Sequence, residues 1–172
     1  HNALDNQMRE ELYAALDGAR DDVAVIVRGE GPSFCSGGDL DEFGTFPGVV
    51  EAHAIRLGRS LALLFAELGP RMVAGIHGAC LGAGIELTAF ASRVVAADNA
   101  RVGLPEGGLG LIPGAGGTVS LRRRSGTAPI LQLLLTGEPV DASTALSWGL
   151  VDEVVPPSRL VGRLHELAGR AA

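Results

Sequence analysis

Short apolar runs alternate with helix-like segments along the chain, and this alternation constrains the fold more than any other feature of the sequence. The runs at 23–27, 72–76, 94–97 and 151–155 have the length and apolar character of buried strands, with 102–103 as a very short fifth candidate. We expect helices over 6–20, 49–68, 84–91, 117–124, 127–135, 142–148 and 158–170, and irregular chain over 104–117. Strands that alternate with helices are typical of α/β domains whose helices cover the sheet, so residues 1–172 are expected to form one such domain.

Composition excludes several classes of function. With 172 residues, 47% of them hydrophobic and 20% charged, the chain is long enough for one domain with a substantial core. The net charge of −6 provides no basic field for nucleic acid or an anionic membrane, and no apolar run reaches membrane-spanning length. The absence of lysine rules out Schiff-base chemistry, the P-loop and the Ser-x-x-Lys nucleophile site. We expect a cytoplasmic protein with neither a nucleic-acid nor a membrane partner.

Cysteine, histidine and glycine patterns indicate no metal or nucleotide site. Cys35 and Cys80 match no metal-binding or CxxC spacing, so we expect two reduced core residues. The four histidines form no ligand cluster, and His77, at the end of an apolar run, is expected to be structural. The segment Gly108–Pro113 has proline where the third glycine of a dinucleotide fingerprint belongs, and no GxSxG elbow is present.

The segment 77–87, HGACLGAGIEL, places small residues at an expected strand-to-helix junction. Small residues let the backbone approach a ligand, and the first amides of a helix are free to donate to an oxyanion. Glu86 follows Ala83 by three residues, about 4.5 Å along a helix axis and on roughly the same face. This pattern is equally compatible with a tight helix start that carries a favourable first-turn acid.

Two loops add further candidates. In the segment 34–39, FCSGGD, two glycines free the backbone to point an amide towards a ligand. In the segment 104–107, LPEG, Glu106 lies among apolar neighbours, where burial would raise its pKa as a general acid requires. Taken alone, the first is compatible with a simple glycine-rich loop and the second with an exposed loop acid.

Together these segments resemble the crotonase superfamily of enoyl-CoA hydratases and isomerases, in register over nearly the whole chain. The resemblance is carried by NALD at 2–5, FCSGGDL at 34–40, HGACLGAGIEL at 77–87, LPE at 104–106 with GLIPGAGG at 110–117, and LTG at 135–137 with WGLV at 148–151. Each piece is moderately specific, and five in the same order are highly specific. The resemblance implies a crotonase-like spiral of ββα units and an acyl-CoA thioester substrate.

The resemblance also assigns roles to residues. By motif position, the backbone amides of Gly38 and Ala83 form an oxyanion hole for the thioester carbonyl. Glu86 and Glu106 fill both positions at which hydratases of the family carry catalytic glutamates. Since family isomerases usually keep only the second acid, the pair favours hydration of a trans-2-enoyl-CoA, or the reverse dehydration. A Δ3-Δ2 enoyl-CoA isomerase that uses Glu106 alone and a catalytically silent CoA-binding protein are the alternatives.

Binding and assembly follow from the same resemblance. Gly38, Asp39, Leu40 and Asp41, together with Ala83, are expected to line the thioester end of the CoA site. No metal is expected, and no cofactor is required beyond the coenzyme A that the substrate carries. The family forms homotrimers or dimers of trimers. The chain departs from the pattern at Ala83, where glycine is usual. The family pattern also includes strands before residue 2 and a longer C-terminal helical segment, so we expect this sequence to be a fragment of a longer chain.

Overall fold

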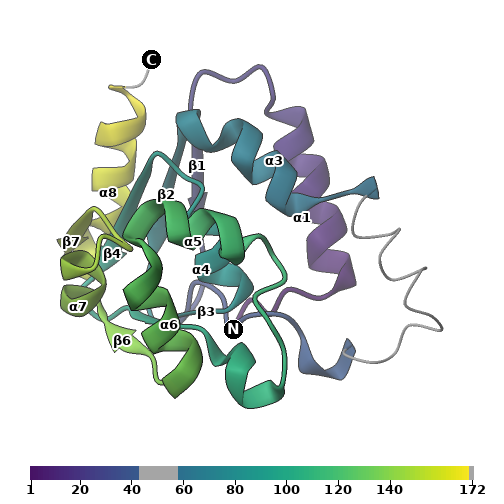
Figure 1. Cartoon of the computed structure of the whole chain (residues 1–172). Helices are drawn as coiled ribbons and strands as arrows, with labels where there is room; N and C mark the ends of the chain where they lie inside the picture. The colour runs from purple at the N-terminus through teal and green to yellow at the C-terminus, as the bar shows by residue number, and fades with distance from the viewer. Residues whose placement is uncertain (43–57, 171–172) are drawn as a thin grey trace.

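Four of the apolar runs form one parallel sheet in the computed structural model, which describes residues 1–42 and 58–170 (Figure 1). Its strands lie in the order β1-β2-β4-β7. They comprise β1 (Val25–Arg28), β2 (Met72–Ile76), β4 (Arg93–Ala97) and β7 (Glu153–Val155). The central strand β2 is buried along its whole length, and its neighbour β4 is buried from its second residue onwards. Strands covered on both faces explain why these runs are continuously apolar rather than alternating.

A second, smaller sheet joins strands that are only two or three residues long. It has the order β3-β5-β6, with β3 (Ala79–Leu81) parallel to β5 (Arg101–Gly103) and β5 antiparallel to β6 (Val140–Asp141). An isolated bridge joins Cys35 to Cys80. The short strand expected at 102–103 is confirmed as β5. The sequence reading missed β3 and β6, because two or three residues are too few for a period-2 pattern to appear.

Helices cover both faces of the larger sheet. They are α1 (Asn6–Gly18), α3 (Leu61–Leu68), α4 (Ala83–Thr88), α5 (Gly117–Ser125), α6 (Thr127–Thr136), α7 (Ala142–Ser147) and α8 (Pro157–Ala168). Three 3₁₀ turns lie at η1 (Leu40–Glu42), η2 (Gly69–Arg71) and η3 (Pro105–Leu109). Leu164 of α8 packs on one face of the sheet, where a Cβ on Gly75 would lie 2.4 Å from its Cδ1. Figure 1 places α1 and α3 beside each other, away from α8.

Most of the expected elements are confirmed. The helix expected at 49–68 is confirmed over its last eight residues, as α3; residues 59–60 are not helical because Ser60 is extended and caps the start of α3, and residues 49–57 lie outside the described residues. The helix expected at 84–91 is shorter and ends at Thr88. After it, the Phe90 and Ala91 amides donate to carbonyl oxygens only three residues back, which forms tight turns before β4 begins. In the described part of the chain, no helix is long and apolar enough to cross a membrane.

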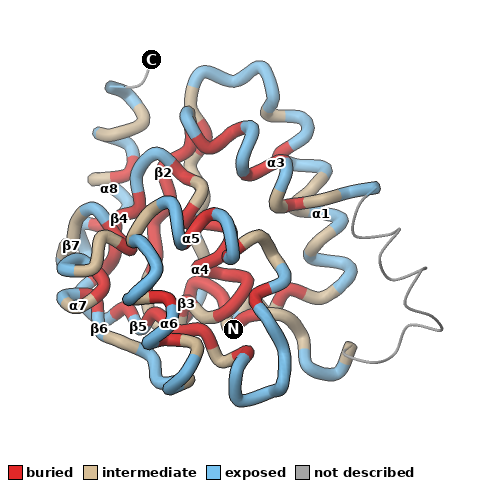
Figure 2. Tube along the Cα trace, in the orientation of Figure 1, coloured by how far each residue is buried: buried red, intermediate tan, exposed pale blue. Residues whose placement is uncertain are grey.

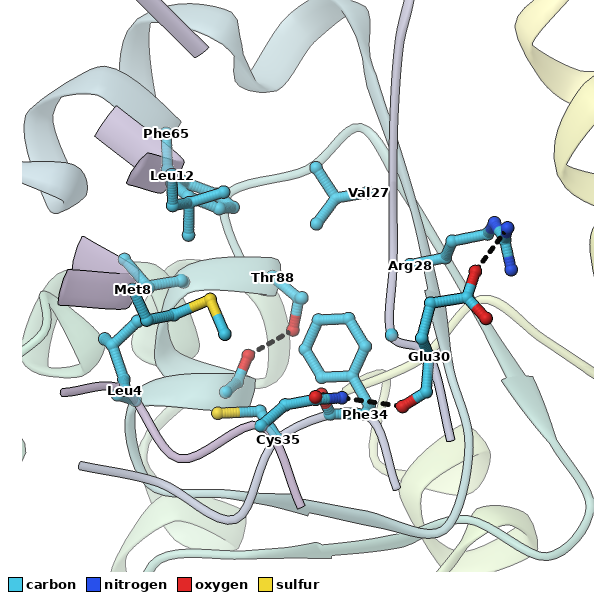
Figure 3. A pocket seen from close by; sticks show the side chains of 15 residues that line it. Leu4, Met8, Leu12, Val27, Arg28, Glu30, Phe34, Cys35, Phe65 and Thr88 are labelled. Carbon is cyan, nitrogen blue, oxygen red and sulfur yellow. Dashed lines mark hydrogen bonds and ion pairs between the residues drawn. The ribbon is translucent and has the colours of Figure 1, made fainter. Parts of the chain in front are cut away.

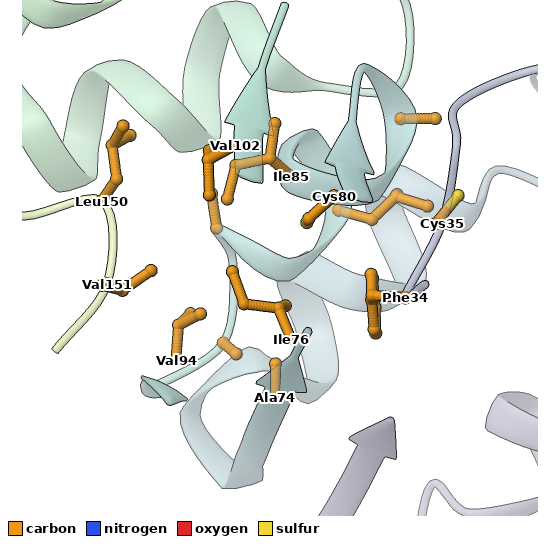
Figure 4. Packing of buried hydrophobic residues seen from close by; sticks show 14 of the residues in the cluster. Phe34, Cys35, Ala74, Ile76, Cys80, Ile85, Val94, Val102, Leu150 and Val151 are labelled. Atoms are coloured by element: carbon orange, nitrogen blue, oxygen red, sulfur yellow. The ribbon is translucent and has the colours of Figure 1, made fainter. Parts of the chain in front are cut away.

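The core concentrates around β2, β4 and α4, as the burial colouring in Figure 2 shows. All six residues of α4 are buried. Ile85 of this helix lies in the main cluster with Ile76 of β2 and Val102 of β5 (Figure 4). Since α4 has no solvent-facing side, Glu86 is carried into the interior by the packing of its neighbours.

Candidate active site

The first turn of α4 follows a sharp change of direction after β3. Gly82 makes this turn with φ +48°, a conformation that side-chain-bearing residues rarely adopt, and its amide donates to the Gly103 carbonyl. A Cβ at this position would lie 2.6 Å from Oε1 of Glu106. Among the described residues, the next amide, that of Ala83, has no hydrogen-bond acceptor. The junction therefore presents a free donor, as the sequence predicted for a helix start.

The glycine-rich loop brings a second free amide to the same place. Gly37, with φ +102°, accepts a 2.8 Å hydrogen bond at its carbonyl from the Leu4 amide. The Asp39 amide donates back to the Leu4 carbonyl at 3.4 Å. The intervening Gly38 amide has no acceptor within the described residues. Gly38 and Ala83 both line one cavity of about 680 Å³.

Asn2 fixes the start of this loop. Its side-chain amide donates to the carbonyl oxygens of Glu30, Ser33 and Phe34, at 2.9, 2.9 and 3.1 Å. The sequence reading used Asn2 only as part of a motif and missed this role. A lone asparagine is an uninformative signal, because the chain segment that it holds lies 28 to 32 residues away.

Glu86 lines the cavity from α4 and is only 1% exposed. Its Oε2 accepts hydrogen bonds from the backbone amides of Ala115, at 2.7 Å, and Gly117, at 2.8 Å. Burial, with a smaller contribution from the neighbouring Glu106, raises the pKa of Glu86 to about 7, although the two amide bonds lower it. Gly117 approaches so closely that a Cβ there would lie 2.5 Å from Cγ of Glu86.

Glu106 lines the cavity from η3 and is 9% exposed. Pro105 opens this turn, which points the acid inwards. Oε2 of Glu106 is buried and has no hydrogen-bond partner among the described residues. Burial raises the pKa of Glu106, partly offset by its hydrogen bonds. The two carboxyl groups therefore differ in their surroundings, one held by two amides and the other with a free oxygen.

The structure thus brings Gly38, Ala83, Glu86 and Glu106 together on one cavity, although they come from three separate segments. Asp39, Leu40 and Asp41 lie in the adjacent turn and are not among the cavity-lining residues. Their contact with CoA, like the roles of the four cavity residues, stays a prediction.

A smaller, mainly apolar cavity of about 330 Å³ lies behind the same helix turn (Figure 3). It is lined by Met8 and Leu12 of α1, Val27 of β1 and Phe34 of the loop. Leu87 of α4 lines both cavities. The short helix α4 therefore contributes to the walls of both cavities.

Other residues singled out by sequence have structural roles. His77 makes a 2.9 Å hydrogen bond between its Nε2 and the Gly31 carbonyl, as expected of a structural histidine. Cys35 and Cys80 are free and buried, and burial raises the pKa of both thiols. The sequence did not predict that the Ala115 and Gly117 amides donate to Glu86, because a backbone donor can belong to almost any residue type.

Comparison with known proteins shows the family to which the chain belongs. The model of the family described as enoyl-CoA hydratase/isomerase matches residues 1–172. The chain belongs to the enoyl-CoA hydratase/isomerase family. It is 40% identical, over 154 residues, to a probable enoyl-CoA hydratase of Bacillus subtilis (strain 168), covering 87% of this chain and 60% of that relative.

Solved structures at 30% identity or more have the same fold. An enoyl-CoA hydratase from Bacillus anthracis superposes with a TM-score of 0.88 at 34% identity, covering 98% of this chain and 67% of that one. DspI of Pseudomonas aeruginosa gives a TM-score of 0.88 at 30% identity, with 98% and 66% covered. The expected crotonase-like α/β fold is therefore confirmed. The chain spans about 60% of the length of its curated relative.

The raised pKa of Glu86 predicts a pH-dependent gain of stability in Glu86→Gln. The pKa of about 7 in the folded protein exceeds the value of about 4.3 expected in the unfolded chain. Ionisation of Glu86 therefore opposes folding. The resulting loss of stability is absent below about pH 4, grows as the pH rises from about 4 to about 7, and is complete above about pH 7. We expect the free energy of unfolding of Glu86→Gln to exceed that of wild type by on the order of 3–4 kcal/mol at pH 8, and to be close to that of wild type at pH 4.5.

Urea unfolding of both proteins at the two pH values measures the difference. Glu138→Gln, at an exposed position outside the cavity, is the matched control and should behave as wild type. A Glu86→Gln variant less stable than wild type at pH 8 would contradict the assigned pKa.

Proposed function

We propose that the protein adds water to the double bond of a trans-2-enoyl-CoA thioester, or catalyses the reverse dehydration. The observation that carries the proposal is the pair of buried carboxyl groups, Glu86 and Glu106, on one cavity with two acceptor-free amides. Carboxyl groups with raised pKa values are suited to exchange protons near neutral pH. The family comparison supports an enoyl-CoA substrate.

In the proposed mechanism, the thioester carbonyl oxygen accepts hydrogen bonds from the Gly38 and Ala83 amides. These bonds strengthen as the oxygen becomes the enolate oxyanion, and one such donor contributes roughly 2.7–4 kcal/mol to the transition state. Glu86 takes a proton from water while the water oxygen bonds to the β-carbon. The α-carbon then receives a proton from Glu106. Water and proton arrive on one face of the double bond, which gives syn addition.

The Ala115 and Gly117 amides orient the Glu86 carboxylate for proton removal. Because they hold Oε2, the other oxygen, Oε1, is the one available to water. This fixes the orientation of the base in the mechanism. Gly38, Asp39, Leu40, Asp41 and Ala83 remain the proposed contacts of the thioester end of CoA. The coenzyme is carried by the substrate, and no metal or further cofactor enters a step.

A Δ3-Δ2 enoyl-CoA isomerase is the second candidate, favoured by one observation. Within the described residues, Glu106 has a buried oxygen without a hydrogen-bond partner, as a single acid that moves a proton between two carbons would need. The homotrimer or dimer of trimers and the cytoplasmic location remain proposals for the whole protein, which rest on the family resemblance.

Assays of the wild-type protein with two substrates test the proposal. We expect loss of the conjugated enoyl-thioester absorbance with crotonyl-CoA, and slower or no conversion of cis-3-hexenoyl-CoA. Conversion of cis-3-hexenoyl-CoA alone would favour the isomerase. Binding of both thioesters without turnover would support the catalytically silent alternative and overturn the proposal.

A further inference from the structure

The turn that follows Gly38 is fastened to the start of α1 by one carboxylate. Glu42, the last residue of η1, accepts the Asn6 amide on Oε1 at 2.8 Å. Its Oε2 accepts from Nη2 of Arg9 at 2.7 Å. Nη2 of Arg9 also donates to Oδ1 of Asn6, again at 2.7 Å. The Glu42 carboxylate thus joins η1 to the first turn of α1 through two bonds, one from a backbone amide and one from the Arg9 side chain, and the Asn6 side chain helps to hold Arg9 in place.

The turn between Gly38 and Glu42 is short and internally bonded. Oδ1 of Asp39 accepts the Asp41 amide at 3.0 Å, and its carbonyl accepts the Glu42 amide at 3.2 Å. A displacement at Glu42 is therefore transmitted to Asp39, the residue next to Gly38. Because Gly37 has the backbone freedom of glycine, the turn itself does not fix the direction of the Gly38 amide.

Backbone hydrogen bonds hold the other side of the Gly38 peptide. Leu4, two residues before Asn6, is bridged to Gly38 through its amide and carbonyl. The Gly38 peptide is consequently held from the Leu4 side by the bridge and from the Glu42 side by the carboxylate. The longer of the bridge bonds, from Asp39 to Leu4, measures 3.4 Å and is weak by itself.

We propose that Glu42 and Arg9 are positioning residues for the Gly38 amide, which they hold in the direction that the thioester oxyanion requires. The inference rests on the proposed function, because it assigns a purpose to the free Gly38 amide. An oxyanion donor is effective only when it is oriented before the reaction, and misplacement by about 1 Å can cost about 100-fold in rate. Arg9 itself lines the cavity, but the proposed role requires no contact of either side chain with the substrate.

Arg9→Met and Glu42→Gln test the proposal, with Arg9→Lys as a rescue. Methionine removes the donor, and glutamine removes the charge while it keeps an acceptor for Asn6. A lysine ammonium carries three donors and restores the bond to Glu42. The pair is partly exposed, with 33% and 24% of the side chains accessible, and exposed pairs contribute little to stability, so the variants are expected to fold. Arg20→Met, which removes the surface ion pairs to Asp17 and Glu67, is the matched control.

The decisive readout is the carbonyl stretch of bound crotonyl-CoA labelled with ¹³C at the thioester carbon, measured by isotope-edited infrared spectroscopy. Hydrogen bonds to the oxygen lower this frequency. We expect a smaller shift from the free thioester, and a kcat reduced 10- to 100-fold, in Arg9→Met and Glu42→Gln, with KM little changed. Arg9→Lys should recover most of both, and Arg20→Met should match wild type.

A full wild-type shift in Arg9→Met and Glu42→Gln would overturn the inference and leave the proposed function standing. A rise in KM confined to the Arg9 variants, without a spectral change, would also overturn it, because Arg9 would then be a substrate contact. A wild-type protein with neither shift nor turnover would instead overturn the proposed function, and with it the inference.

Discussion

Glu106→Gln is expected to lower kcat for crotonyl-CoA hydration at least 100-fold while it changes substrate binding little. Glutamine has nearly the same shape but carries no proton that it can deliver to the α-carbon, and general acids contribute about 10²- to 10⁴-fold to such reactions. The thioester is bound elsewhere in the proposed complex, by the Gly38 and Ala83 amides. Initial rates over a range of crotonyl-CoA concentrations separate the two effects.

Glu138→Gln is the control for this experiment, since it makes the same chemical change at an exposed position outside the cavity. It should leave kcat and KM unchanged. Near-normal turnover in Glu106→Gln would remove Glu106 from the mechanism. A large rise in KM with normal kcat would show instead that the carboxyl group serves binding.

Glu86→Gln is expected to abolish most hydration, and the addition of Glu106→Gln is expected to lower the rate little further. Both carboxyl groups act on the same water addition, and groups that act as a unit are strongly non-additive. An isomerase would respond differently. Conversion of 3-enoyl-CoA to 2-enoyl-CoA would survive Glu86→Gln and be destroyed by Glu106→Gln, because one acid suffices to move the proton.

The measurement is both reactions in wild type, in the two single variants and in the double variant. Circular dichroism and urea unfolding establish that each variant is folded. Full hydration by Glu86→Gln would refute the two-glutamate mechanism and leave the isomerase as the better proposal. If the losses of the two single variants multiply in the double variant, the two carboxyl groups do not act as a unit, which would contradict the proposal.

The sequence predicted the elements that are long enough to have a period. The strand at 72–76 matches β2, and the helix expected at 6–20 matches α1 to within two residues. It also located the residues that meet at the cavity, because Gly38, Ala83, Glu86 and Glu106 each belong to a motif of recognisable spacing. Local reasoning alone left Glu86 undecided between a site residue and a first-turn acid, and it favoured an exposed loop acid for Glu106. The order of the five motifs decided their interpretation.

Features that depend on distant pairs were beyond the sequence. The bond from Arg9 to Glu42 joins residues 33 positions apart, and the amides that hold Glu86 come from 29 and 31 residues downstream. The elevated pKa of Glu86 follows from the complete burial of α4, and a helix of six residues is too short for its hydrophobic pattern to predict that burial. Tertiary packing, rather than local propensity, sets these properties.

The contacts between glycines and glutamates have a consequence for protein engineering. Each candidate catalytic carboxyl group packs against a glycine that has no room for a side chain, Glu106 against Gly82 and Glu86 against Gly117. A mutant library aimed at a wider substrate range should therefore keep these two glycine codons constant. Diversity belongs at the apolar wall, where Ala62 and Ile112 line the cavity and Ile112 is largely exposed. Under the proposed function, a change of side-chain size at Ile112 alters the room available to the acyl chain in this cavity.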